Sequence, residues 1–469
     1  MKQPMTQEER FIQMTETPVS KLIPKLAVPT IISMLITSIY NMADTFFVSQ
    51  IGTSASAAVG INFSLMAMIQ AIGFTLGMGS GNYISRLLGR KEREEASRTA
   101  ATGFFTALTL GLIMALIGLP NIESLVRMLG ATETVAPYAR DYAQYILIAA
   151  PYMTCSFVMN NILRSQGNAF YSMLGIATGG ILNMILDPLF IFGLGLGISG
   201  AALATILSQL VSFCILLYQC NKQEGSIHIQ ISKFTFKWRI YKEILHAGLP
   251  TFCRQGLASV ASVTLNVAAA PFGDAALAAM SIVTRIMMFI SSSLIGFGQA
   301  FQPVCGFNFG AKRIDRVQEA FWFCVKVAVI LLSALGIVFF ILGPQVLRAF
   351  RRDDLEVIRI GTLALRLQCV MLPFQAWTIM VNMLTQSIGY GFRASIVSMG
   401  RQGICLIPAL LILPKTRGLL GLQLSQPVAD GLTFLIATAI VINVLKDLKN
   451  LEAKYNAELP EDLEQNAAD

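Results

Sequence analysis

Apolar stretches recur along the whole chain, and each is long enough to cross a lipid bilayer. A helix of about 20 apolar residues spans the roughly 30 Å hydrocarbon core of a membrane. The breaks between these stretches predict twelve helical spans, at residues 23–48, 55–84, 97–119, 137–160, 171–193, 198–219, 244–270, 275–303, 318–343, 359–384, 393–413 and 418–445. Only 13% of the residues are charged, whereas soluble domains contain about 25%. We therefore expect an all-α integral membrane protein with about twelve transmembrane helices.

Lysine and arginine residues gather in every second group of connections. They occur in the N-terminal tail, in the loops at 86–93, 222–242 and 312–316, and in the C-terminal tail. Most opposite loops nearly lack them, apart from 348–352, which acidic residues follow, and the short turn at 415–417. Basic loops stay on the cytoplasmic side. We therefore predict a multi-pass protein of the inner (cytoplasmic) membrane with both termini in the cytoplasm, and assign the net charge of +8 to topology rather than to nucleic-acid binding.

The two halves of the chain resemble each other. At an offset of 221 residues Pro29 matches Pro250 and Gly89 matches Gly310, and after one insertion the match continues, for example from Gly167 to Gly389. Six crossings return the chain to its starting side, so the halves share one orientation and are related by a pseudo-two-fold axis along the membrane normal. We expect two six-helix lobes at 21–220 and 242–445, a cytoplasmic linker at 221–241, and cytoplasmic tails at 1–20 and 446–469.

Three acidic side chains lie inside the predicted spans: Asp44, Asp187 and Asp430. A carboxylate at a helix centre costs about 2.5 to 3.5 kcal/mol on insertion scales, so each needs a partner, a water-filled cavity or a function. Asn183 lies one helical turn before Asp187 on the same face, and Pro188 follows and frees a backbone carbonyl in the preceding turn. These oxygens suit a proton or a hard cation such as Na⁺.

Asp44 lies deep in the first span, one turn after Tyr40, and Pro29 earlier in that span can bend the helix. If Asp44 and Asp187 face one pocket, their repulsion disfavours the doubly charged state, and the pair can take up and release a proton. The alternative is that Asp44 only hydrogen-bonds a neighbouring helix.

The acidic residues are not repeated in the second half. At the offsets of the repeat, Asp44 falls opposite Leu265 and Asp187 opposite Ala409. We therefore predict that ion coupling resides in the first half, while the second half contributes to substrate contact and to the movement of the lobes.

The second half contains charged residues of another kind. Asp430 has no acidic neighbour, and Arg401 lies midway along the preceding span, so we interpret the two as a structural ion pair.

A substrate cavity is predicted around the eighth span. Arg285 lies at its middle beside Met287 and Met288, whose flexible side chains suit a promiscuous apolar cavity. Arg285 has three interpretations: it binds an anionic substrate group, pairs with a carboxylate, or packs against backbone carbonyls. Gln255 and Asn160 complete the candidates for this cavity.

Cysteine and histidine residues give no sign of a metal centre or an enzyme. The eight cysteines lie mostly in apolar segments without paired spacing, so we expect reduced packing residues. Both histidines belong to one polar region, and no nucleophile and base occur at helical spacing. We expect no enzymatic activity and no cofactor.

Several segments resemble the multidrug and toxic compound extrusion (MATE) family. The resemblance rests on Tyr40–Val48, Asn161–Gly167, Asn183–Pro188, Gln302–Lys312, Arg401–Gln402 and Gln426–Asp430, and it covers nearly all of 20–445. The acidic pattern is similar to the DinF-type branch. The resemblance implies that Asp44 and Asp187 are protonated in turn or share a Na⁺ ion, that Tyr40, Asn183 and Thr205 complete this pocket, and that Pro29 is the bending point.

The activity that the resemblance implies is antiport, in which H⁺ or Na⁺ enters while an amphipathic, often cationic drug or metabolite leaves by alternating access of the two lobes. A flippase of lipid-linked saccharides and a membrane channel are the alternatives. The sequence leaves the coupling ion and the native substrate open. We expect a monomer, because one pseudo-symmetric chain can enclose a pathway in the bilayer by itself.

Overall fold

The structure is a computed structural model that describes residues 6–222, 227–350 and 354–457. Parts of the predicted tails and linker, together with Arg351 and Arg352, lie outside the described residues. The described segments form helices and their connections. The α-helices are α1 (Gln7–Glu16), α2 (Val19–Ser49), α3 (Thr53–Gly89), α4 (Arg93–Gly118), α5 (Ile122–Met128), α6 (Ala136–Ser165), α7 (Ala169–Pro188), α8 (Gly197–Lys222), α9 (Trp238–Ala269), α10 (Asp274–Gly310), α11 (Ile314–Phe350), α12 (Leu355–Ser387), α13 (Gly391–Met399) and α14 (Leu406–Ala457). Two π-helices, η1 (Leu189–Gly193) and η4 (Gly400–Ile404), continue α7 and α13, and two 3₁₀-helices, η2 (Ile231–Lys233) and η3 (Ala270–Phe272), flank α9.

The long helices agree with the twelve predicted spans. Ten stretches of the described chain are long and apolar enough to cross a membrane. The last, Gly391–Ala457, contains two crossings, because the backbone reverses at Gly418, where φ is 60°. Helix α9 adds the twelfth crossing: it is 32 residues long but less apolar, since it contains Arg254 and Gln255, and it packs alongside the others against α3 and α13. All eight cysteines are free; six are buried, whereas Cys214 is exposed and Cys253 is half-buried.

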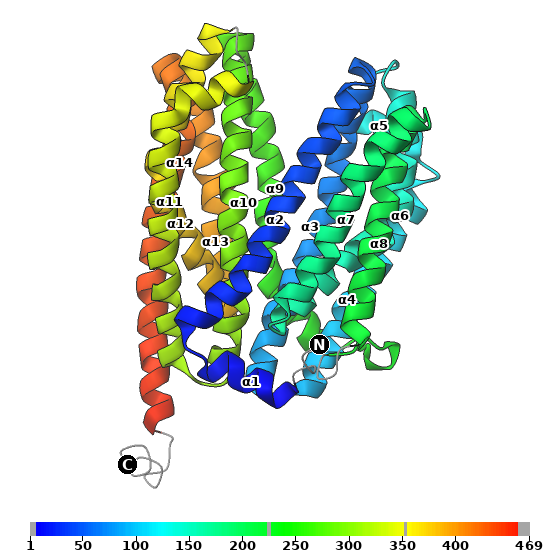
Figure 1. The fold of residues 1–469 in the computed structure, drawn as a ribbon. Coiled ribbons are helices and arrows are strands. Elements are labelled where there is room, and N and C mark those ends of the chain that lie inside the picture. The colour runs from blue at the N-terminus through cyan, green and yellow to red at the C-terminus, as the bar shows by residue number, and fades with distance from the viewer. Residues whose placement is uncertain (1–5, 223–226, 351–353, 458–469) are drawn as a thin grey trace.

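The helices gather into two lobes (Figure 1), one built from α2–α8 and the other from α9–α14. We call them the N-lobe and the C-lobe. Helix α1 and the C-terminal end of α14 lie at the same end of the molecule, which we call the inner end. Across the lobes α2 packs against α10, and α3 packs against α9 and α10. Toward the opposite, outer end, α2 and α10 diverge (Figure 1).

Glycine residues allow the lobes to touch at the inner end. A Cβ atom added to Gly89 in α3 would overlap the carbonyl oxygen of Phe307 in α10, and one added to Gly310 in α10 would overlap the carbonyl oxygen of Arg86 in α3. Gly89 and Gly310 are partners in the internal repeat. The two helices therefore meet backbone to backbone, with the same contact made once from each lobe.

Helix α1 lies across this inner end (Figure 1). It begins with a capping box, in which Thr6 and Glu9 each hydrogen-bond the other's backbone N–H through their side chains. At its other end Met14 is buried, and the Nδ2 atom of Asn308 in α10 donates to the carbonyl oxygen of Met14 at 3.0 Å. The N-terminal segment is thereby fixed to the C-lobe.

Candidate functional site

The predicted acidic pocket forms inside the N-lobe, between α2, α7 and α8. Asp187 has 0% exposure, and Asn183 one turn earlier is also buried. The Nδ2 atom of Asn183 lies 3.3 Å from Asp187 Oδ1 and 3.3 Å from Thr205 Oγ1 in α8. One amide group thus connects the carboxylate of α7 to the hydroxyl of α8. The π-helix η1 begins directly after Pro188, so the regular backbone pattern changes beside this pocket.

Helix α2 brings Asp44 and Tyr40 to the same place. Gly180 of α7 faces Tyr40, and a Cβ atom there would come within 3.4 Å of the tyrosine ring, so the two helices pack closely. Tyr40 is buried and interacts electrostatically with both Asp44 and Asp187, and the two carboxylates interact with each other. The structure therefore brings together all five residues predicted for the pocket, here called the acidic group: Tyr40, Asp44, Asn183, Asp187 and Thr205.

Several oxygen atoms in and near the acidic group are buried without a hydrogen-bond partner among the described residues. They are Asp44 Oδ1, Asn183 Oδ1, Asp187 Oδ2 and Ser208 Oγ. Buried polar atoms are satisfied in the great majority of cases. Carboxylate, amide and hydroxyl oxygens are the atoms that a hard cation prefers as ligands, and a proton on one carboxylate would supply a donor to its neighbours. The acidic group therefore suits either ion.

Tyr142 is a member of this region that sequence reasoning missed. It lies in α6, is fully buried, and its hydroxyl interacts electrostatically with Asp44 and Asp187. A tyrosine near the start of an apolar span gives no sign of which way its side chain turns, whereas an aspartate inside a span attracts attention at once. We include Tyr142 as a neighbour of the acidic group.

The C-lobe contains the predicted ion pair. Arg401 Nε lies 3.0 Å from Asp430 Oδ1, and both side chains are largely buried. The Nε2 atom of Gln426 donates to the same carboxylate oxygen at 3.1 Å. Arg401 lies on the π-helix η4. Asp430 is thus a satisfied carboxylate, unlike the two carboxylates of the N-lobe.

The structure does not gather the residues predicted for a substrate cavity. Asn160 is 1% exposed and donates to the carbonyl oxygen of Ser172 in α7 at 3.3 Å, so it packs α6 against α7 and has no surface for a substrate. Met287 is buried in the core of the C-lobe. Arg285 and Met288 on α10 are exposed, and Gln255 on α9 is half-buried. Only the last three are accessible to a substrate.

Arg164 connects the lobes inward of the acidic group. It is buried near the end of α6 and donates to Gln299 of α10 in the other lobe and to Asn161 of its own helix. The space beside these residues, between α3, α6 and α10, amounts to only about 10 Å³, which leaves no room for a substrate. Arg164 lies beyond the predicted fourth span, which ends at residue 160, whereas α6 continues to Ser165.

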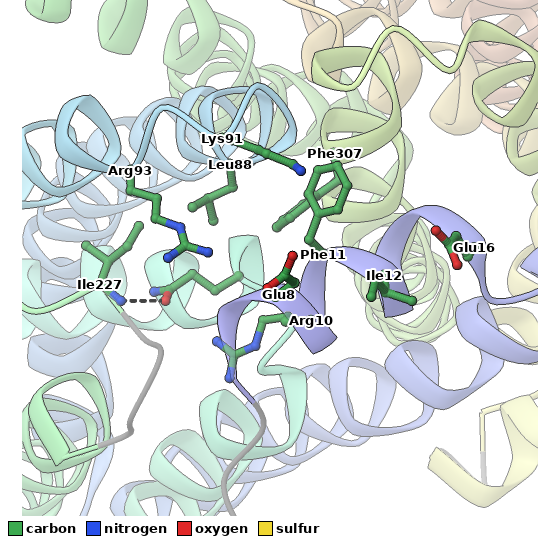
Figure 2. Close-up of a pocket in the computed structure, with 11 residues that line it drawn as sticks. Glu8, Arg10, Phe11, Ile12, Glu16, Leu88, Lys91, Arg93, Ile227 and Phe307 are labelled. Carbon is green, nitrogen blue, oxygen red and sulfur yellow. Dashed lines mark hydrogen bonds between the residues drawn. The ribbon is translucent and has the colours of Figure 1, made fainter. Parts of the chain in front are cut away.

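A cavity of about 280 Å³ opens at the inner end (Figure 2). Helix α1, the α3–α4 connection, the linker and α10 contribute its lining, and Lys91 Nζ lies 4.7 Å from the centre of the Phe11 ring. Its charged lining residues have both signs: Glu8 and Glu16 are acidic, and Arg10, Lys91 and Arg93 are basic. We interpret this cavity as part of the contact between α1 and the lobes, separate from the acidic group.

Comparisons with known proteins agree with this geometry. The MatE family model matches residues 29–189 and 250–411. The two matches start 221 residues apart and end 222 apart, which are the offsets of the internal repeat. A multidrug export protein, MepA of Staphylococcus haemolyticus, is 27% identical over 440 residues, which cover 93% of this chain and 96% of that protein.

Solved structures of MATE transporters are similar throughout. One, described as a multidrug resistance MATE family transporter in the outward-facing conformation, has a TM-score of 0.88 and 29% identity, covering 94% of this chain and 98% of the other. Another, a MATE protein in complex with MaL6, has a TM-score of 0.88 and 28% identity, covering 94% and 99%.

Proposed function

This chain belongs to the MatE family and is therefore a multi-pass membrane transporter rather than an enzyme; from that premise we propose that it exports amphipathic, often cationic compounds in exchange for H⁺ or Na⁺. The observation that carries the proposal is the acidic group, in which the buried carboxylate of Asp187 interacts with the half-buried carboxylate of Asp44, and neither forms an ion pair within the described residues. Such a pair favours binding of a cation or proton. The relatives that are multidrug exporters make drugs the first compounds to test.

The exchange follows from two arrangements of the lobes. In the present arrangement the lobes meet through Gly89, Gly310 and Arg164 at the inner end and diverge at the outer end. We propose that this is the outward-open arrangement. An ion shifts the balance between two arrangements only by its difference in affinity for them. Entry of H⁺ or Na⁺ into the acidic group from outside would change the packing of α2 against α7, with Pro29 as the bending point, release the drug and favour the return of the carrier.

The membrane setting belongs to the same proposal. We propose that the protein lies in the cytoplasmic membrane as a monomer, with α1 and the C-terminal end of α14 in the cytoplasm. The basic loops support this orientation, because those at 86–93 and 312–316, and the described part of the linker at 227–242, flank the inner ends of the helices. The lobe boundaries at 21–220 and 242–445, with a linker at 221–241, are part of the proposal.

Uptake of ethidium into inverted vesicles tests the function. A proton gradient and a sodium gradient are applied separately to the parent and to the Asp44→Asn and Asp187→Asn variants. We expect one gradient to drive uptake by the parent, and both substitutions to abolish it, because each removes a carboxylate that binds the ion. Uptake by Asp187→Asn at the parent's rate under the same gradient would contradict a coupling role for the acidic group.

A further inference from the structure

The membrane-spanning parts of the two lobes differ in charge. The N-lobe holds the carboxylates of Asp44 and Asp187. In the C-lobe Arg401 is neutralised by Asp430, and three more arginines lie inside spans: Arg254 in α9, Arg285 in α10 and Arg366 in α12. Of these, Arg285 is the exposed one. Among the described residues no hydrogen bond or ion pair forms to the guanidinium of Arg285. An ionised side chain within a membrane span is costly and marks a functional site unless it is paired.

Arg285 lies on the face of α10 that is directed at the N-lobe. Ser292 follows it by two helical turns, which places both on one side of the helix. Ser38 of α2 donates to Ser292 at 3.0 Å between the two hydroxyl oxygens. The face that carries Arg285 is therefore the face that meets α2, and not a face directed at lipid.

Side chains of both lobes are exposed at the level of Arg285. Outward of the Ser38–Ser292 contact, Arg285 is exposed and Met288 is 61% exposed on α10. On the facing side of α2, Met42 is 47% exposed. The two helices diverge in this direction (Figure 1). Arg285 thus lies on the α10 face directed at α2, at a depth where side chains of both helices are exposed.

Arg285 and the acidic group lie at similar depth. Asp44 follows Ser38 by six residues along α2, and Arg285 precedes Ser292 by seven along α10, which runs in the opposite direction. At 1.5 Å per residue, both lie about 10 Å outward of the serine contact. A compound between the lobes at this depth would have carboxylates on one side and a guanidinium on the other.

We propose that Arg285 binds a carboxylate of the exported compound, so that the preferred substrates are amphipathic zwitterions rather than simple cations. The planar guanidinium donates two parallel hydrogen bonds to a carboxylate, a geometry that a lysine cannot reproduce. The basic group of the same compound would be attracted toward the acidic group. This inference rests on the proposed function, since it names the substrate class of the same pathway.

Rhodamine 110 and rhodamine 123 provide a matched pair of probes, because the second is the methyl ester of the first and lacks only the free carboxylate. Their uptake is measured in proteoliposomes with the parent, Arg285→Gln and Arg285→Lys. We expect Arg285→Gln to raise the half-saturating concentration of rhodamine 110 about tenfold or more and that of rhodamine 123 less than about twofold, with Arg285→Lys in between, because a charge-assisted hydrogen bond is lost only for the acid.

Arg366→Gln is the matched control. Arg366 is a half-buried arginine in the C-lobe helix α12, and its Nε donates to the carbonyl oxygen of Phe340 at 3.0 Å. Arg366→Gln should change the half-saturating concentrations of rhodamine 110 and rhodamine 123 by the same factor. Equal changes for both dyes in Arg285→Gln, or no change for either, would overturn the proposal.

Direct binding separates this inference from the proposed function. Fluorescence anisotropy of each dye with purified protein in detergent needs no gradient. If the parent transports neither dye under either gradient, the exporter proposal fails, but a loss of rhodamine 110 binding confined to the Arg285 variants would still support the carboxylate site. If the parent binds rhodamine 123 as tightly as rhodamine 110, the zwitterion preference is wrong. Should Arg285→Gln fail to fold, Arg285→Lys answers the same question.

Discussion

The two lobes share a backbone and differ in chemistry. Even small irregularities recur: Lys91 and Lys312, partners in the repeat, both have left-handed backbones, with φ of 62° and 61°. Yet the position of Asp187 in the N-lobe corresponds to Ala409 in the C-lobe. The unsatisfied carboxylates occur in one lobe and the satisfied ion pair in the other. Duplication therefore conserved the helix geometry, while the buried polar residues of each lobe took separate roles.

The largest change in the free energy of unfolding is expected from Asp430→Asn in the C-lobe. The substitution leaves the buried guanidinium of Arg401 without its carboxylate, and breaking a buried pair from one side costs about 3 to 5 kcal/mol. We expect the free energy of unfolding of the purified protein in detergent to fall by this amount. Ethidium transport per folded molecule should stay close to that of the parent, because the pair is structural.

Two comparisons sharpen this prediction. The double variant Arg401→Met, Asp430→Leu should recover most of the stability, since apolar residues of similar size replace a buried pair at little cost. Asp187→Asn in the N-lobe should show the opposite pattern, with transport lost and stability kept, because its carboxylate forms no ion pair with any residue that the structure describes. If Asp430→Asn retains full stability but loses transport, the C-lobe is a second chemical site and the division between the lobes is wrong.

A smaller free-energy change is expected from alanine substitutions at Gly89 and Gly310, where the two lobes touch at the inner end. In Gly89→Ala or Gly310→Ala the new methyl group would overlap a backbone carbonyl of the other lobe. Overpacking of this kind costs about 1 to 3 kcal/mol. The cost falls only on the arrangement closed at the inner end, so ethidium uptake should fall about tenfold or more, as expected for a shift of 1.4 kcal/mol or above.

Gly60→Ala is the matched control for this contact. Gly60 lies in the same helix α3, and a Cβ atom there would meet nothing within 4 Å. Ethidium uptake by the Gly60→Ala variant should equal that of the parent. Equal activity of all three alanine variants would mean that the inner ends of the lobes do not need to close as tightly as they do here.

Much of this architecture could be predicted because a bilayer imposes simple rules. All twelve spans and the register of the repeat follow from apolar length and from matched glycine and proline residues. The acidic group was also predictable, since a carboxylate such as Asp187 is rare inside a span and its partner Asn183 lies one turn away.

Helix rotation was not predictable from the pattern. In a membrane the lipid-facing and protein-facing sides of a helix are both apolar, so the sequence does not say which way a residue such as Asn160 or Met287 turns. This is why two candidates for the substrate cavity are buried, and why Tyr142 was missed beside the acidic group. The contact of Arg164 with Gln299 joins residues from both lobes, which no local pattern encodes.

The smallest change in the free energy of unfolding is expected from removal of a hydrogen bond that occurs at equivalent positions in both lobes. Asn160 donates to the carbonyl oxygen of Ser172, and its repeat partner Asn382 donates to that of Ala394, the partner of Ser172. Each bond joins two neighbouring helices of its own lobe. We expect Asn160→Ala and Asn382→Ala each to lower the free energy of unfolding by about 1 kcal/mol.

The two losses should also be additive within about 0.5 kcal/mol, because the sites share no partner. The half-saturating concentration for ethidium should not change in Asn160→Ala, since Asn160 is buried between α6 and α7. A change confined to Asn160→Ala would return this residue to the substrate pathway. Equal losses in both variants would instead identify the bond as part of the duplicated scaffold, on which the chemistry of each lobe developed separately.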